Sequence, residues 1–551
     1  MSDVTLTHIS TEMVRWLDDR FGGDWHFDVH LYNVGGGELA VEGELKANGR
    51  KVTHRIVMGD DPALAVLSIG DRIETATVRS LEACVVGYDS GPSALVYTPT
   101  TLKKVTIDPI KARLIGGAFN TIAQEMAQTL YRMSCSSIVR ESEDLSCGLF
   151  DAEGRQICES ESSPRHMGSL PSYIRNFMSQ LGGQVYEGDI IIHNHPYFGA
   201  SHTQDMGVAL PIFCEGDLLG FSASTAHLVD VGGATPGANV DLIDIYAEGM
   251  LFHSVKLYER GRRNEEVWSL LQNSVRTPEL NVADIEAMIA AVHLGRERFL
   301  ALITKYSAQT VMGTAYHWMD YSERRLRAEI KSISDGDYHA ESWLDNDGRN
   351  REVPLKVNVT VKVRGSDVVI DLAGSADEVE TAYNVPFEGS LQVGCFYAIR
   401  TLMLDDAVSG EFISQNDGMF RPISAIAPKG SIFNPNFPRA CRSGMAQIQQ
   451  VIDCVIRALA PVVPDRVTAG NAASGMTLSY WGFHAERQQY WVCVEINDGS
   501  YGGRATKDGL DTVDTLLTNT RNVPIEEVEM RYPVRVERYQ MRDEPPGAGR
   551  W

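Results

Sequence analysis

The sequence lacks several signals that would direct a protein out of the cell or into a membrane. It has no basic and then apolar leader at its amino terminus, and no apolar run approaches the ~20 residues of a membrane span. Its 9 cysteines are odd in number and form no C-x-x-C pair. A disulfide framework and a four-cysteine zinc site are therefore not expected. Together these absences predict a cytoplasmic protein that does not enter a membrane.

Two catalytic signatures and an excess of positive charge are also missing. No G-x-x-x-x-G-K-[ST] segment occurs, so we do not expect this chain to bind ATP through a P-loop. No nucleophile, base and orienting residue form a series typical of a hydrolase triad. The 50 Lys and Arg residues against 73 Asp and Glu residues give a net charge of −23. This balance argues against nucleic-acid binding, because neutralising phosphate requires a basic face.

What is present is typical of a large globular protein. The chain has 551 residues, of which 43% are hydrophobic and 22% charged, and this length exceeds what one core supports. We predict an α+β fold with mixed and antiparallel sheets and packed helical segments. Four regions are expected: a small α/β accessory module at 1–106, a strand-rich metal-site domain at 107–279, a helical segment at 280–335, and an α+β C-terminal domain at 336–551.

Apolar spacing predicts the helices. The long apolar series from Leu114 to Met133 predicts a helix over 110–134, and a second helical region follows at 280–333 with Asn281 or Asp284 as its cap. Shorter helices are predicted at 11–17, 390–404 and 444–460.

Alternation and turn residues predict the strands. Asn48-Gly49 between two alternating runs indicates a hairpin. Strands are expected to dominate from about 145 to 260, including buried runs at 190–192 and 208–213, and alternation that includes Val353 predicts sheet over 352–373. Further strand-like segments lie at 76–78 and 94–97.

Two imidazoles and one carboxylate form the most informative pattern, an H-x-x-D…H set of His202, Asp205 and His227. Such a set leaves open positions on a divalent metal, as a catalytic site requires. Turn-forming residues precede the first ligand and follow the last, which is how many metal sites are held between strands. The ligand types suit Mn²⁺, Zn²⁺ or Fe²⁺ and do not separate them.

An ordered series of motifs, not the metal pattern alone, resembles the hydantoinase B/oxoprolinase family, which includes the metal-bearing subunits of acetone and acetophenone carboxylases. The likeness runs from about residue 107 to the last residue, roughly four-fifths of the chain. Its main segments are Arg140–Cys147 with Phe150-Asp151, His166–Pro171, Asn194–Asp205, Ala226–Gly233, Asn273–Pro278, Phe420–Pro422, Gly499–Arg504 and Thr518–Pro524.

The chain departs from the family pattern at two places. His195 stands where hydantoinase-type members usually have Asp, and the segment from Asn194 to His202 looks closer to the ketone carboxylases. The sequence also stops at Gly547–Trp551, where the family normally continues into a strand-rich stretch. We therefore expect that stretch to be a separate chain or to be missing here.

The resemblance implies the metal-bearing subunit of an ATP-dependent ketone carboxylase, which joins an activated enol and bicarbonate-derived CO₂. It implies a hydantoinase A-like partner that uses ATP and Mg²⁺, and it leaves open whether small subunits are also present. The resemblance therefore predicts a hetero-oligomer. The alternative is a subunit of an ATP-dependent cyclic-amide hydrolase of the hydantoinase, 5-oxoprolinase or lactamase type. A third reading is a scaffold subunit whose metal only stiffens a loop. We expect the module at 1–106 to dock partners, since it lies outside the family match.

Several further residues are candidates for the site. His195 is a candidate general base, and Asp230 could orient a ligand imidazole or bind the metal. Arg140 and Glu141, with Asp144, form a charged cluster that is either an ion network near the site or an exposed strand edge. A glycine-rich turn could present backbone N–H groups and a cation to a phosphate or carboxylate; its candidate binding residues are Gly502, Gly503 and Arg504.

Overall fold

The computed structural model describes five strands between residues 26 and 77, and residues 108–541 except 167, 238, 407–410, 412, 472–475 and 498. The chain divides into two compact units. One is Met1–Ala94 with Phe177–Val185, and the other is Leu95–Asn176 with Tyr186–Trp551. The predicted helix at 11–17, the turn Asn48-Gly49 and the segment at 94–97 lie outside the described residues. The four predicted region boundaries remain predictions.

The first unit contains an antiparallel meander with the strand order β1-β2-β3-β4-β5. The predicted hairpin is confirmed, because β2 pairs with β3 in a register that places Ala47 opposite Arg50. The strands are β1 (His26–Asn33), β2 (Leu39–Ala47), β3 (Arg50–Met58), β4 (Leu64–Ile69) and β5 (Arg72–Thr77).

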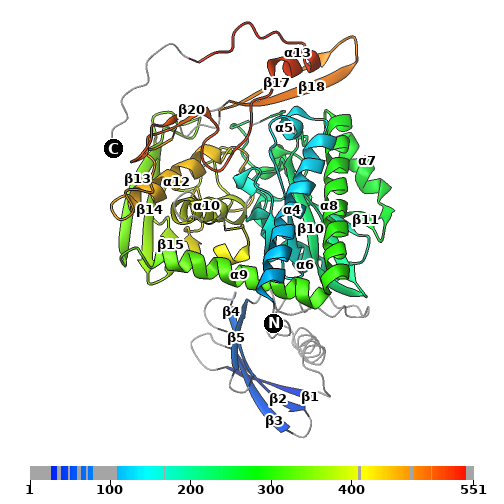
Figure 1. Ribbon diagram of the computed structural model, residues 1–551, viewed down its shortest axis with the longest axis vertical. Coiled ribbons are helices and arrows are strands. Elements are labelled where there is room, and N and C mark those ends of the chain that lie inside the picture. Colours follow the sequence, from blue (N-terminus) through cyan, green and yellow to red (C-terminus); the bar gives the residue numbers. More distant parts are fainter. Residues whose placement is uncertain are drawn as a thin grey trace. The chain divides into compact units, whose positions relative to one another are not determined.

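A seven-stranded sheet, ordered β12-β11-β8-β9-β10-β6-β7, forms one half of the second unit, and its neighbouring strands pair antiparallel. Helices α4 (Pro109–Met133) and α8 (Pro278–Tyr306) pack on each other and across β6, β9 and β10 (Figure 1). A side chain at Gly295 of α8 would collide with Met126 and Ser222, so the glycine allows this close approach. The strands are β6 (Leu145–Asp151), β7 (Gln156–Glu159), β8 (Ile190–His193), β9 (Asp205–Cys214), β10 (Asp217–His227), β11 (Val255–Glu259) and β12 (Arg262–Arg263).

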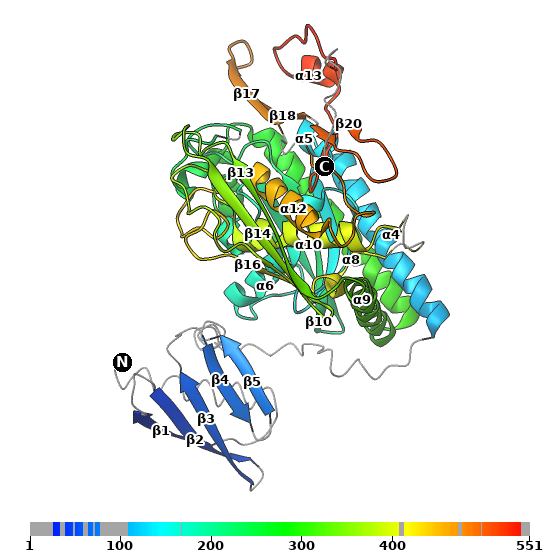
Figure 2. The ribbon, with the colours of Figure 1, turned by 90° about the vertical axis from the view of Figure 1, so that its left-hand side faces the viewer.

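The other half has its own core on a four-stranded sheet, ordered β13-β14-β15-β16, in which only β15 and β16 run parallel. Helices α10 (Gln392–Met403) and α12 (Met445–Leu459) pack together, and α12 covers β13 and β14 (Figures 1 and 2). Buried and partly exposed residues alternate along β14, as predicted. Val353, which was predicted to belong to this alternation, precedes the strand and is 55% exposed. The remaining strands are β13 (Gly336–Leu344), β14 (Leu355–Arg364), β15 (Asp367–Asp371), β16 (Ile423–Ile426) and two small hairpins, β17 (Met476–His484) with β18 (Gln489–Asn497) and β19 (Gly499–Tyr501) with β20 (Leu510–Val513).

The helices match the predicted long segments, and four further described helices, α5, α6, α7 and α13, were not predicted. The described helices are α4 (Pro109–Met133), α5 (Ser137–Arg140), α6 (Ser169–Leu181), α7 (Glu265–Ser274), α8 (Pro278–Tyr306), α9 (Ala308–Ile330), α10 (Gln392–Met403), α12 (Met445–Leu459) and α13 (Ile525–Arg531). Within this described part, no helix combines the length and apolar character that crossing a bilayer requires. The mixed helices and antiparallel sheets confirm the α+β class.

Several local predictions were wrong. Leu114 and Met133 are 59% and 53% exposed, because they lie off the buried stripe of α4 that includes Phe119 and Met126. Asn281 and Asp284 do not cap the second helical region, since α8 already begins at Pro278. Helices α6 and α7 occupy stretches where strands or no helix were expected.

Candidate metal centre

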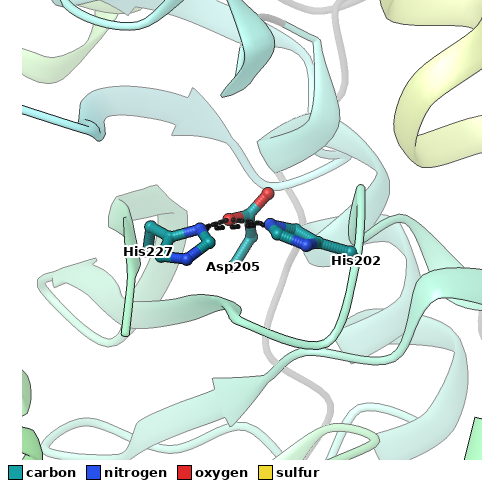
Figure 3. A group of neighbouring side chains, drawn as sticks. All are labelled: His202, Asp205 and His227. Carbon is teal, nitrogen blue, oxygen red and sulfur yellow. Dashed lines mark hydrogen bonds and ion pairs between the residues drawn. The ribbon is translucent and has the colours of Figure 1, made fainter. Parts of the chain in front are cut away.

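The three predicted ligands meet at one end of the β9–β10 hairpin. Asp205 begins β9 and His227 ends β10, and the register places them directly opposite each other. His202 lies one turn before Asp205 in the preceding loop. Asp205 Oδ1 is 2.8 Å from His202 Nε2 and 3.2 Å from His227 Nδ1, and these two nitrogens are 3.2 Å apart (Figure 3). All three side chains are buried and point to a common centre.

Electrostatics keep Asp205 and His202 in the forms that bind a cation. Burial alone would raise the pKa of the Asp205 carboxyl, but His202, Arg165 and His166 outweigh it and hold that pKa well below its usual range. Burial, with Arg165, lowers the pKa of His202 to about 3. At neutral pH the pair therefore offers a carboxylate and a neutral imidazole, which is what metal coordination requires.

Neighbouring groups fix the orientation of two donors. His202 Nδ1 lies 3.2 Å from the carbonyl oxygen of Arg442. This contact holds the imidazole ring so that Nε2 faces the centre. The Tyr173 hydroxyl donates to the carbonyl of Asp205 at 3.0 Å, and the Ser201 hydroxyl donates to its carboxylate.

Two more titratable residues complete the cluster, and the sequence did not single them out as ligands. Asp144 Oδ2 is 3.8 Å from His227 Nδ1, and Asp144 Oδ1 is 3.2 Å from His166 Nε2. His166 Nδ1 is 3.9 Å from Asp205 Oδ2, and Arg165 Nε is 3.6 Å from the same oxygen. Burial lowers the pKa of His166, but Asp205 and Asp144 outweigh this effect and raise it.

The residues present fit a divalent metal. Nitrogen and carboxylate donors converge within 4.8 Å of one another, and His166 Nδ1 is buried without a hydrogen-bond partner among the described residues. His202, Asp205 and His227 would hold the ion, with Asp144 and His166 beside it. This mixed N/O set suits Mn²⁺, Zn²⁺ or Fe²⁺, as predicted from the sequence, and leaves the choice among them open.

His195 lies in an aromatic cluster. Its ring centroid is 4.8 Å from that of Phe198 and 5.7 Å from that of His253. Its Nδ1 accepts from the backbone N–H of Tyr197, and burial lowers its pKa to about 4. The neutral ring therefore carries its proton on Nε2, where it offers a hydrogen-bond donor and not a base.

The Asp230 carboxylate is hydrogen-bonded to Arg276 and not to the described metal-site donors. Its carboxylate accepts from the backbone of Arg276 at 2.5 Å and from the Arg276 guanidinium at 3.0 Å, while Asn281 donates to its carbonyl. Asp230 is thus bound to the start of α8, and the structure does not bring it into the group of donors around Asp205.

Arg140 and Glu141 pair with each other at 3.1 Å, and the arginine side chain is about half exposed. The member of this charged cluster that turns inward is Asp144. Glu143 before it adopts a left-handed backbone with φ of 56°, and the strand β6 begins directly after Asp144. The sequence identified the right cluster, but only this turn decides which carboxylate reaches the centre.

The glycine-rich turn uses its amides within the fold. Gly502 N–H donates to Gly470 and Arg504 N–H donates to Lys507, so these groups are taken by backbone carbonyls. The carbonyl of Gly503 accepts from Ala469. The Arg504 guanidinium lies 4.0 Å from Asp405. Arg504 of this turn lines a cavity that it shares with Arg400, and no residue of the turn belongs to the described group of metal donors.

Comparison with known proteins agrees with this fold. The hydantoinase B/oxoprolinase family profile matches residues 108–551. The B-type subunit of a putative D-/L-hydantoinase from Pseudomonas sp. (strain NS671) is 43% identical over 464 residues, covering 82% of this chain and 77% of that protein. The crystal structure of the ATP-dependent caprolactamase from Pseudomonas jessenii superposes with a TM-score of 0.74 at 26% identity, covering 79% and 75% of the two chains. A nucleotide-free acetone carboxylase structure shares the fold, with a TM-score of 0.71 at 20% identity over 79% of this chain and 59% of that one. The chain therefore belongs to the hydantoinase B/oxoprolinase family.

Proposed function

We propose that this chain is the metal-bearing subunit of an ATP-dependent enzyme that opens cyclic amides of the hydantoin or 5-oxoproline type. The observation that carries the proposal is the buried His202, Asp205 and His227 centre in a chain that is 43% identical to a protein named as a hydantoinase subunit of the B type. The sequence alone favours a ketone carboxylase over a cyclic-amide hydrolase. The identity to the hydantoinase subunit reverses that order.

The residues around the centre supply what ring opening needs. A divalent cation held there would act as a Lewis acid on the amide carbonyl and on water. Burial of the donors excludes bulk solvent and strengthens every charge interaction in the site. His166 is positioned beside Asp205 and Asp144, where a ring N–H would donate a hydrogen bond near the charge that develops on the carbonyl oxygen.

ATP would be used by a partner. The related caprolactamase is named as ATP-dependent, and the related hydantoinase protein is named as a subunit. Since this sequence lacks a P-loop, we assign nucleotide chemistry to a hydantoinase A-like subunit and place this chain in a hetero-oligomer. The sheet β1–β5 has two edge strands, β1 and β5, and we propose that the accessory module attaches partners through such edges.

The test is an ADP-release assay on the purified complex with two sets of substrates. Hydantoin and 5-oxoproline form the first set, and acetone or acetophenone with bicarbonate forms the second. The proposal predicts ADP release and ring-opened product with the first set alone. Turnover restricted to the ketones would overturn it, and so would wild-type turnover in a complex with the His202→Ala chain.

A ketone carboxylase remains the second candidate because of one observation. His195 stands in a segment that looks closer to ketone carboxylases than to hydantoinases. Its structural setting, a donor-bearing imidazole among aromatic rings, is compatible with a carbonyl substrate. The same assay decides between the two reactions.

A further inference from the structure

A cavity of ≈ 500 Å³ lies in the second unit, outside the group of metal donors. One wall is a single face of α10, where Tyr397, Arg400 and Thr401 recur at helical spacing. The segment 159–164 forms another wall, and the glycine-rich turn with Arg504 forms a third. The size is that of a small-molecule site.

Arg400 is the arginine in this cavity that forms no ion pair within 4.0 Å among the described residues. The other two arginines on its walls are engaged: Arg466 pairs with Glu329 at 3.0 Å, and Arg504 lies 4.0 Å from Asp405. By contrast, Arg400 Nε is buried with no hydrogen-bond partner in the described part of the chain. A buried guanidinium N–H left unbonded is costly, so this group is arranged to receive an acceptor from a ligand.

The cavity and the metal centre are bordered by consecutive residues of the chain. The 3-10 turn η1 (Pro164–His166) presents Pro164 to the cavity, while the following Arg165 and His166 lie within 4 Å of Asp205. A molecule in the cavity would thus be separated from the metal donors by one turn of chain. This is the placement expected for a group that holds a substrate while its other end reacts.

The charges on the walls select the kind of anion. Glu161 and Asp406 both act electrostatically on Arg400, and Asp405 also lines the cavity. A phosphate, which is close to doubly charged, would be repelled by these carboxylates more strongly than a singly charged group. Burial raises the pKa of Glu159 to about 7, which reduces the negative charge on that wall. A planar carboxylate also matches the guanidinium fork.

We infer that the cavity binds the carboxylate of a small cyclic substrate, with Arg400 as its anchor and the determinant of specificity. The choice of a cyclic amide as the rest of the molecule rests on the proposed function. The recognition of a carboxylate does not, because it follows from Arg400 and the walls of the cavity.

The experiment compares two ligands that share a ring, 5-oxoproline and 2-pyrrolidinone, which lacks the carboxylate. Their dissociation constants are measured by calorimetry on the full-length chain, wild type and Arg400→Gln. We expect wild type to bind 5-oxoproline roughly ten- to a hundredfold more tightly, the usual effect of a charge-assisted hydrogen-bonded pair. Arg400→Gln should remove this preference, and Arg400→Lys should restore only part of it.

Arg298→Gln is the matched control, because Arg298 is exposed on α8 and pairs with Glu125 outside the cavity. It should keep the preference. Equal affinity of wild type for both ligands, or a preference that survives in Arg400→Gln, would overturn the inference. Inorganic phosphate that displaces 5-oxoproline at equal concentration would also overturn it, since the site would then be a general anion site. Arg400-dependent binding without cyclic-amide turnover by the complex would remove the proposed function and leave this inference standing.

Discussion

Gly207→Ala should damage both the stability of β9 and the metal centre. A side chain at Gly207 would overlap ring carbons Cδ2 and Cε2 of Tyr173. That ring is 1% exposed, and its hydroxyl donates to the Asp205 carbonyl at 3.0 Å. The ring therefore has no free space to enter, and moving it breaks the bond that positions the start of β9.

The size of the effect follows from two contributions. Overpacking of a filled core costs typically ~1–3 kcal/mol, and loss of the Tyr173 hydrogen bond adds about 1 kcal/mol. We therefore expect a destabilisation of about 2–4 kcal/mol, together with weaker metal binding because Asp205 is displaced. Unfolding of a chain with two units is not expected to be two-state, so apparent melting temperatures are compared at one fixed scan rate.

The control is the same substitution at Gly117, an exposed position of α4 with no atom within 4 Å of an added Cβ. Gly117→Ala should stabilise the helix by about 0.5–1 kcal/mol, because alanine loses less backbone entropy on folding. The two variants should thus shift melting in opposite directions. If Gly207→Ala melts with wild type and retains its metal, the packing of Tyr173 does not position Asp205 and this reasoning fails.

Three other changes test separate parts of the account. Arg442→Met should lower metal affinity about 10–100-fold, as measured by titration with a chelator. The backbone carbonyl of Arg442 orients His202, and its buried guanidinium holds that backbone to Glu248. Arg439→Met on the same loop should leave the metal affinity unchanged. Burial raises the pKa of Glu248 to about 7, so the folded state favours the neutral carboxyl. The stability that the neutral carboxyl contributes to folding is fully present below pH 4.5 and is lost as the pH rises through 7. Glu248→Gln should therefore gain stability relative to wild type between about pH 5 and pH 8, on the order of 2–3 kcal/mol, and a pH-independent difference in melting would contradict this. Removal of residues 1–106 should leave the metal bound but weaken co-purification with the ATP-using subunit, and assembly at the wild-type ratio would remove the docking role.

The sequence predicted the metal triple because its determinants are local. A turn at 215–216 connects β9 and β10, and a bulge between Leu218 and Gly220 then shifts the register by one residue, which places Asp205 opposite His227. The i,i+3 spacing then brings His202 to the same point. These relations need no knowledge of the rest of the fold.

The partners around the triple were not predictable in this way. Asp144 reaches the site because β6 pairs with β10, and His166 reaches it from a 3-10 turn that follows β7. Both depend on contacts between distant segments, which periodicity does not report. Helix α6 was not predicted for a different reason. Leu170, Tyr173 and Ile174 show helical spacing, but they lie in a region, about 145 to 260, where the pattern predicts mainly strands.

The most direct test of the account is the metal content of the purified chain. Elemental analysis is compared among wild type, His202→Ala/His227→Ala and His317→Ala, whose histidine is exposed on α9. The account predicts about one divalent transition metal per chain in wild type and His317→Ala. It predicts almost none in the double variant, with an unchanged circular dichroism spectrum. Wild-type protein without stoichiometric metal, or a double variant that retains it, would contradict the central claim.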